Sequence, residues 1–145
     1  NQSGSPYLGT KSSPTQIGAG TDWGLVRSWN GGAFGIKTGG TLWAWGSNSG
    51  RFGNNSEQQR SSPTQIPGTN WEWIEASHSL IYARKTDGSL WSWGYNASGQ
   101  NGVNDNYDYP GGKRSSPIQI PGSWTLDALS LGPIPSRAGA ALKAP

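Results

Sequence analysis

The sequence predicts an all-β protein built from four-stranded antiparallel sheets, and three observations lead to this prediction. The first is composition: the 145 residues include 23 glycines and 10 prolines, while nine tryptophans can fill a core from few positions. The second is patterning, because short alternating runs are separated by turn signals, with no long helical periodicity. The third is repetition, since LWAWG at Leu42–Gly46 returns as LWSWG at Leu90–Gly94.

A second repeated run gives the period of the chain. SSPTQI occurs at Ser12–Ile17 and at Ser61–Ile66, and SSPIQI follows at Ser115–Ile120. The runs therefore recur at about 50 residues, and each interval contains several strand signals. Such a period is typical of a β-propeller, in which each unit forms one four-stranded blade.

Four strands are predicted in each unit, most clearly in the second. Trp71–Ala76 is the first strand, and Ser79–Lys85 is the second, because it alternates and ends at a Thr-Asp-Gly turn. Ser89–Tyr95 leaves directly from that turn as the third strand. The fourth is the SSPTQI-type run, and its proline, which lacks an N–H, places it at a sheet edge.

Alternation gives the LWxWG run a structural meaning. Leu42, Ala44 and Gly46 share one face of the predicted strand, while Trp43 and Trp45 share the other. Blades pack face to face, so a tryptophan of one blade can fill the space beside a small residue of its neighbour. Gly46 is expected to permit a bulge or a close backbone approach. The residues predicted to lock blades together are Trp43, Trp45, Trp91 and Trp93.

The second unit also contains the pattern H-S-L-x6-D-G-x-L-x-x-W-G-x-N-x-x-G-Q, from His78 to Gln100. This pattern resembles the repeat of the regulator-of-chromosome-condensation family, and the LWxWG and SSPTQI runs resemble its bacterial and bacteriophage branch. The resemblance covers roughly residues 12 to 131 and implies a seven-bladed propeller with His78 as a structural blade residue. The first unit matches less fully, with Arg51 and Phe52 where the second has Gln100 and Asn101.

The repeat divides the chain into five predicted segments. They are the end of a preceding blade (1–17), two complete blades (18–66 and 67–120), the first strand of a further blade (121–131) and an irregular tail (132–145). Two blades cannot close a ring and would leave large apolar faces exposed. We therefore expect a fragment or piece of a seven-bladed ring; the alternative is that several copies assemble into one ring.

Charge and composition argue against several classes of function. The net charge is +3 and the basic residues are scattered, so no nucleic-acid partner is expected. The chain has no cysteine, and no apolar run approaches the length of a membrane span. His78 is the only histidine, and Glu72 and Glu75 are matched in the first unit by Gly24 and Arg27. We therefore expect no enzyme activity, no cofactor and no metal site.

The loops that follow the two LWxWG runs are the predicted binding surface, because they differ between repeats on a common scaffold. The longer one carries an insertion at Val103–Gly112 that is rich in Asn, Asp and Tyr. It lacks the distant glutamate of a calcium loop, so a polar turn is preferred over a calcium site. The candidate binding residues are Arg51, Asn54, Asn55, Gln100, Tyr107 and Tyr109.

The sequence therefore favours a non-enzymatic structural or recognition module. Its expected partners are other protein chains, either the remaining blades of a ring or neighbouring subunits, and a cell-surface glycan or receptor. The resemblance to the bacterial and phage branch implies a virion-surface or secreted, extracellular setting. Two alternatives stay open: a lectin-like, carbohydrate-binding propeller, and a guanine-nucleotide exchange factor or chromatin-binding protein as among the family's eukaryotic members.

Overall fold

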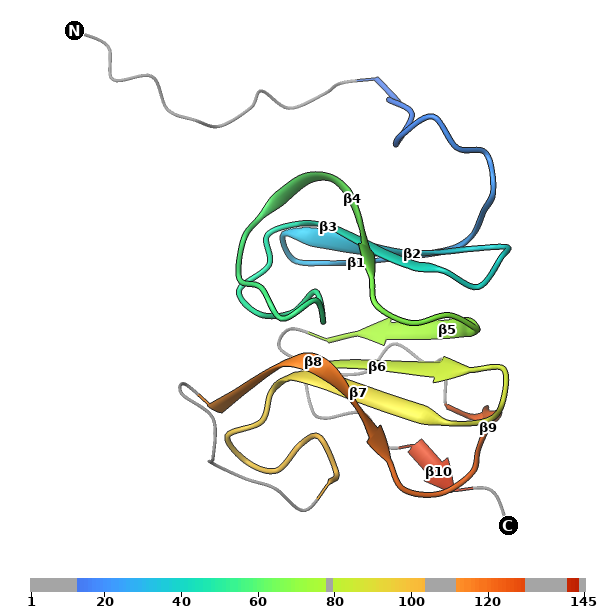
Figure 1. The fold of residues 1–145 in the computed structure, drawn as a ribbon, viewed down its shortest axis with the longest axis vertical. Coiled ribbons are helices and arrows are strands. Elements are labelled where there is room, and N and C mark those ends of the chain that lie inside the picture. Colours follow the sequence, from blue (N-terminus) through green and yellow to red (C-terminus); the bar gives the residue numbers. More distant parts are fainter. Residues whose placement is uncertain (1–12, 78–79, 104–111, 130–140, 144–145) are drawn as a thin grey trace, which may run out of the picture.

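The computed structural model describes residues 13–77, 80–103, 112–129 and 141–143. Within these ranges the chain forms three antiparallel sheets and no α-helix (Figure 1). Consequently, no helix among the described residues is long and apolar enough to cross a membrane. The all-β class and the four-stranded antiparallel sheets predicted from the repeat are confirmed.

Two four-stranded sheets follow one another along the chain. The first sheet consists of β1 (Trp23–Trp29), β2 (Gly32–Lys37), β3 (Leu42–Gly46) and β4 (Arg60–Ile66). The second sheet consists of β5 (Trp71–Ala76), β6 (Leu80–Lys85), β7 (Leu90–Tyr95) and β8 (Lys113–Ile120). In both sheets the spatial order is the chain order, so every connection is between antiparallel neighbours. The proline-bearing run is the edge strand of each sheet, as its missing N–H requires.

A third sheet continues the series. It pairs β9 (Trp124–Leu129) with β10 (Ala141–Lys143). The Trp124 N–H donates to the Gly88 carbonyl at 3.2 Å, just as the Trp71 N–H donates to the Gly40 carbonyl at 3.0 Å. The third sheet is therefore joined to the second in the way that the second is joined to the first.

Two segments differ locally from the sequence-based expectation, while the division of the chain into blades stays a prediction. Residues 13–17, which were expected to form the last strand of a preceding blade, form no strand, because the described residues before β1 offer them no strand to pair with. The tail expected to be irregular contains β10, because the edge of β9 presents unpaired backbone groups that even a short segment can satisfy. Ser79, expected to begin the second strand of its unit, lies outside the described residues.

Glycine shapes the end of each LWxWG strand. Gly46 and Gly94 have φ angles of 98° and 110°, and the strand register shifts just before both residues. A Cβ atom on Gly46 would lie 2.5 Å from the Gly31 carbonyl oxygen. The strand thus ends in a bulge that requires both positive φ and close backbone approach, which glycine alone tolerates.

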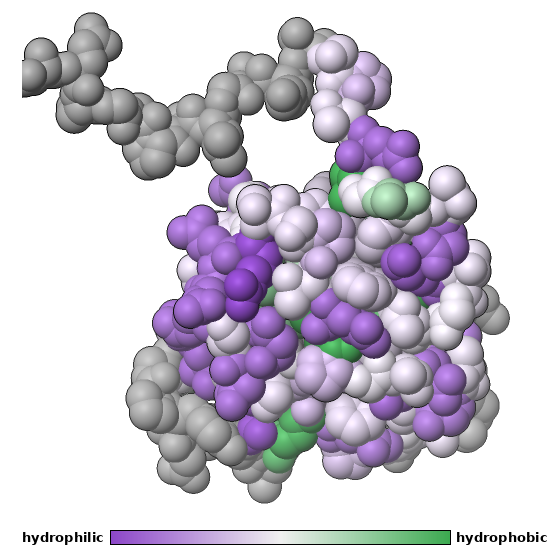
Figure 2. All heavy atoms as spheres, turned by 45° about the horizontal axis from the view of Figure 1, so that its top comes forward, coloured by the Kyte–Doolittle hydropathy of each residue, from purple (hydrophilic) through white to green (hydrophobic). Residues whose placement is uncertain are grey.

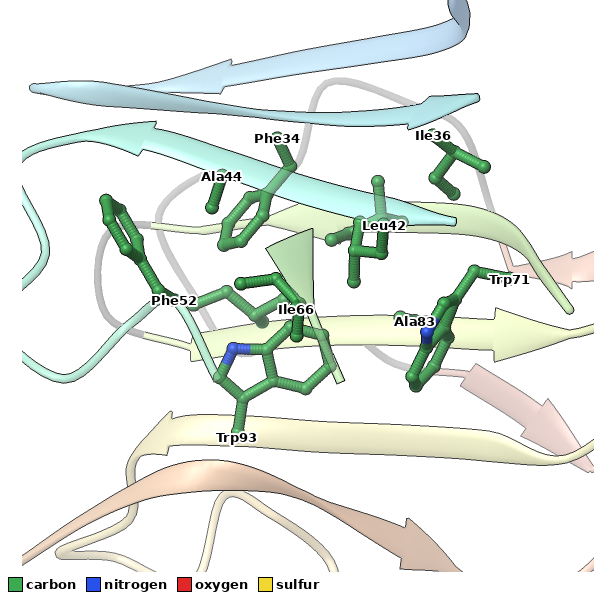
Figure 3. Packing of buried hydrophobic residues seen from close by; sticks show 11 residues of the cluster. Phe34, Ile36, Leu42, Ala44, Phe52, Ile66, Trp71, Ala83 and Trp93 are labelled. Atoms are coloured by element: carbon green, nitrogen blue, oxygen red, sulfur yellow. The ribbon is translucent and has the colours of Figure 1, made fainter. Parts of the chain in front are cut away.

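The main core lies between the first and second sheets. Phe34, Leu42 and Ala44 of the first sheet point toward Trp93 of the second, and all four are fully buried (Figure 3). The small Gly53 of the first unit lies against the large Trp93 indole, because a Cβ atom at Gly53 would be 2.9 Å from Trp93 Nε1. Large and small residues therefore alternate across the junction and fill the space between two pleated surfaces.

Candidate functional site

The same set of side chains occurs on one face of each large sheet. In each set a Trp pairs with a Lys across the first two strands, and the two LWxWG tryptophans follow on the third. We call these sets the first and second tryptophan faces. The first consists of Trp23, Val26, Lys37, Trp43 and Trp45. The second consists of Trp71, Ile74, Lys85, Trp91 and Trp93.

The second tryptophan face is covered by the first sheet. Trp93 and Ile74 are fully buried, Trp71 retains only 2% of its exposure, and all three belong to the core cluster that Phe34 and Leu42 share. Trp91 is half-buried and packs against the same cluster. The indole rings meet edge-on, with the Trp71 ring centroid 6.1 Å from that of Trp91 and 6.2 Å from that of Trp93.

The first tryptophan face has no sheet over it within the described residues. Val26, the counterpart of Ile74, is 45% exposed. Trp43 and Trp45 are half-buried and contact Trp23, with ring centroids 6.4 and 5.6 Å apart. The side of the molecule that Figure 2 shows is mostly hydrophilic, with hydrophobic colour confined to small, separate areas. The open face thus combines an exposed aliphatic side chain, Val26, with half-buried indoles.

The loop between β3 and β4 does not project freely, because it lies against the second sheet. The Trp93 indole N–H donates to the Arg51 carbonyl oxygen at 2.7 Å. Asn55 is joined to β8 twice, since its N–H donates to the Ser115 carbonyl and its side-chain oxygen accepts from the Ser115 hydroxyl. The structure thus brings Arg51, Asn54 and Asn55 together at the junction of the two sheets.

A buried asparagine that sequence reasoning did not single out organises this loop. The Asn48 side chain is fully buried, donates to the Ser56 and Gln58 carbonyls, and accepts from the Phe52 N–H. Asn96 repeats the arrangement in the second unit by accepting from the Asn101 N–H. The repeated W-G-x-N spacing was the signal that could have identified both residues.

The remaining candidates fall in or near the second long loop. The Gln100 carbonyl accepts from the Tyr82 hydroxyl at 2.8 Å, and the Gln100 side chain accepts from the Ser98 N–H. Burial raises the pKa of Tyr82. His78, Tyr107 and Tyr109 lie outside the described residues, as does most of the 103–112 insertion.

A lysine ammonium lies over the indoles of each tryptophan face. Lys37 Nζ is 5.3 Å from the Trp23 ring and 5.2 Å from the Trp43 ring. It also pairs with Asp22 at 3.0 Å, and this hydrogen bond to the ammonium lowers the pKa of the Asp22 carboxyl. Lys85 Nζ lies 4.7 and 4.8 Å from the Trp71 and Trp91 rings. Cation–π attraction thus holds both lysines against aromatic walls.

The acidic residues of the second sheet are used in ion pairs. Glu72 pairs with Arg84, whose Nε donates to the Trp124 carbonyl at 2.7 Å, and Glu75 pairs with Arg27 of the first sheet at 3.6 Å. Among the described residues no group of three His, Cys, Asp or Glu side chains could hold a metal ion. Each carboxylate thus has a structural partner that accounts for its position.

Comparisons with known proteins rest on structure rather than sequence. No protein-family model matches the sequence, and no curated protein matches it significantly. Prp20p from Saccharomyces cerevisiae superimposes with a TM-score of 0.61 and 21% identity, over 71% of this chain and 25% of that one. Yeast RCC1 (Prp20), in its structure with Kap60, superimposes with a TM-score of 0.65 and 20% identity, over 78% of this chain and 27% of that one.

A human protein shows the same likeness. WBSCR16 superimposes with a TM-score of 0.58 and 19% identity, over 70% of this chain and 26% of that one. The chain thus spans about a quarter of the length of each of these structures. The two large sheets correspond to blades, and the chain has the fold of the RCC1-type β-propeller.

Proposed function

We propose that the chain is a non-enzymatic β-propeller module that binds other protein chains through the first tryptophan face. One observation carries the proposal: Val26 is 45% exposed, whereas its counterpart Ile74 is fully buried by a neighbouring blade. Because the two faces share their chemistry, a surface like the one that covers the second face suits the first. Related folds support protein binding, since Prp20p is described with Gsp1p and histones, and yeast RCC1 with Kap60.

The covered face specifies the chemistry of the partner. It receives a small residue, Gly53, against the large Trp93, and its Trp93 N–H donates to a backbone carbonyl of the covering blade. The partner of the first face therefore offers small and aromatic side chains, together with a loop carbonyl that can accept from Trp45. A blade of the same repeat type, whether from the same polypeptide or another, meets these requirements.

The proposal places the protein on a virion surface or outside a bacterial cell, on the basis of the sequence resemblance to the bacterial and phage branch. No catalytic step is assigned to any residue. Immunogold labelling of intact particles and cells tests this setting, and label confined to the cell interior would contradict it.

Sedimentation velocity tests the binding surface, with a second copy of the chain as the probe. We expect the chain to show mass above 15.4 kDa that rises with concentration. The Val26→Glu variant should remain at the mass of one chain, because it places a charge on the open face without removing a buried contact. Tyr95→Glu is the matched control, since Tyr95 is 41% exposed and lies in the other large sheet.

Two results would overturn the proposal. One is a wild-type chain that sediments as a single copy at every concentration. The other is a Val26→Glu variant that associates as strongly as wild type while Tyr95→Glu does the same.

A further inference from the structure

A small cavity lies at the junction of the two large sheets, on the covered tryptophan face. Its volume is about 380 Å³, within the range of small-molecule sites. Its walls come from the β3–β4 loop, the link between the sheets, and strands β5 to β8. The residues used below are Asn54, Pro67, Gly68, Lys85, Trp91 and Pro117.

Lys85 brings a positive charge to this cavity. Its Nζ lies over the Trp71 and Trp91 rings and would be 3.6 Å from a Cβ atom on Gly68, which also lines the cavity. Among the described residues Lys85 forms no ion pair. The carboxylate of the adjoining turn, Asp87, accepts from the Ser89 N–H and hydroxyl. These hydrogen bonds lower the pKa of Asp87 most, and the charge of Lys85 contributes a smaller lowering without forming an ion pair.

The first sheet shows what Lys85 lacks. Lys37, at the equivalent position, pairs with Asp22 at 3.0 Å. The second sheet has Asn70 in place of Asp22. The two positions are equivalent because the Thr38 N–H donates to the Asp22 carbonyl and the Thr86 N–H donates to the Asn70 carbonyl. The substitution removes the internal carboxylate and leaves an ammonium on aromatic walls, where a carboxylate from a ligand would form a charge-assisted hydrogen bond.

We propose that this cavity binds a carboxylate carried on a sugar-sized ring, such as a uronic acid. Lys85 holds the carboxylate, while the flat apolar surfaces of Trp91, Pro67 and Pro117 accommodate the ring. Asn54 also lines the cavity and adds a polar side chain to its wall. The inference is independent of the first tryptophan face, because the cavity lies on the other one.

Titration with sodium glucuronate, followed by the indole N–H signals in NMR, tests the proposal on the 145-residue chain. We expect saturable shifts from tryptophans of the cavity. Lys85→Gln should weaken binding by about tenfold, because a charge-assisted hydrogen bond is lost. Lys85→Arg should retain binding, since it keeps both the charge and the stacking on the indoles. Lys37→Gln is the matched control and should leave binding unchanged.

Two control ligands separate the contributions of the ring and the carboxylate. Neutral glucose has the sugar ring without the carboxylate, and acetate has the carboxylate without the ring. Both should bind at least about tenfold more weakly than glucuronate. Glucose binding as strong as that of glucuronate, equal affinity in wild type and Lys85→Gln, or the absence of saturable shifts would overturn the assignment. If Lys85→Gln fails to fold, the Lys85→Arg and Lys37→Gln pair together with the two control ligands still decides the question.

Discussion

The two large sheets carry the same pattern of Trp and Lys in an equivalent register, yet only one of their tryptophan faces is buried. The second face is buried because a blade lies over it, while the first remains open within the described chain. Burial of a repeated side chain therefore depends on the neighbouring unit rather than on the local sequence. This is the expected behaviour of a repeat array, in which each unit is stabilised largely through its neighbours.

The largest expected effect comes from replacing the equivalent residues Trp93 and Trp45, one on the covered and one on the open tryptophan face, with alanine. Trp93→Ala removes a fully buried indole and its hydrogen bond to the Arg51 carbonyl, so we expect a loss of about 3–5 kcal/mol in the free energy of unfolding. Trp45→Ala, on the open face, should cost less than about 2 kcal/mol, because water already reaches the indole. Urea unfolding followed by far-UV circular dichroism measures both, and equal losses would contradict the comparison.

The two sheets share a bulge at the glycine that ends each LWxWG run, and alanine substitution tests whether each sheet needs it. Gly46→Ala and Gly94→Ala should each cost about 1–3 kcal/mol, because both glycines have positive φ angles. Gly39→Ala is the control: nothing lies within 4 Å of its added Cβ, so the effect should stay within about 0.5 kcal/mol. Urea unfolding measures all three, and a glycine that tolerates alanine would show that its sheet does not need the bulge.

The two units also differ in the loops after β3 and β7, where the first unit has Phe52 and the second has Asn101. Both residues are fully buried, but the two polar side-chain atoms of Asn101 have no partner among the described residues. Asn101→Leu should therefore stabilise the chain by about 1 kcal/mol, because an unsatisfied buried amide is replaced by an apolar group of similar size. The thermal midpoint measures this change. A lower midpoint would indicate that the Asn101 amide makes contacts that leucine cannot replace.

Sequence reasoning reached the fold because the blade pattern is local. Alternation in Leu90–Tyr95 and the turn at Thr86–Gly88 are set by neighbouring residues, and the structure has the strand and the turn at these places. By contrast, β10 could not be predicted, because Ala141–Lys143 becomes a strand only through the edge of β9. Pairing with a distant strand leaves little trace in three residues.

The candidate site was predictable only in part, because its contacts join segments that are distant in the sequence. The β3–β4 loop was selected because it differs between the two repeats, but its attachment to the second sheet depends on Trp93 and Ser115, which are distant in sequence. The cavity was missed because it joins segments from both units. The substitution of Asn70 for Asp22 was visible in the repeat, but its consequence for Lys85 needed the positions of the indole rings.

The smallest expected effect concerns the lysine of the first tryptophan face, which has a carboxylate partner. Lys37 lowers the pKa of Asp22 below its ordinary value of 3.8, so the folded state favours the ionised carboxyl. The pair therefore contributes stability above pH 4, and this contribution is lost as the pH falls through the lowered pKa. Asp22→Asn should reduce the urea midpoint slightly at pH 7 and by a smaller amount at pH 2, where more of the carboxyl is protonated. Asn70→Ser, at the equivalent neutral position, should give a difference that does not vary with pH. A loss in Asp22→Asn that is as large at pH 2 as at pH 7 would mean that the carboxylate acts through packing rather than charge.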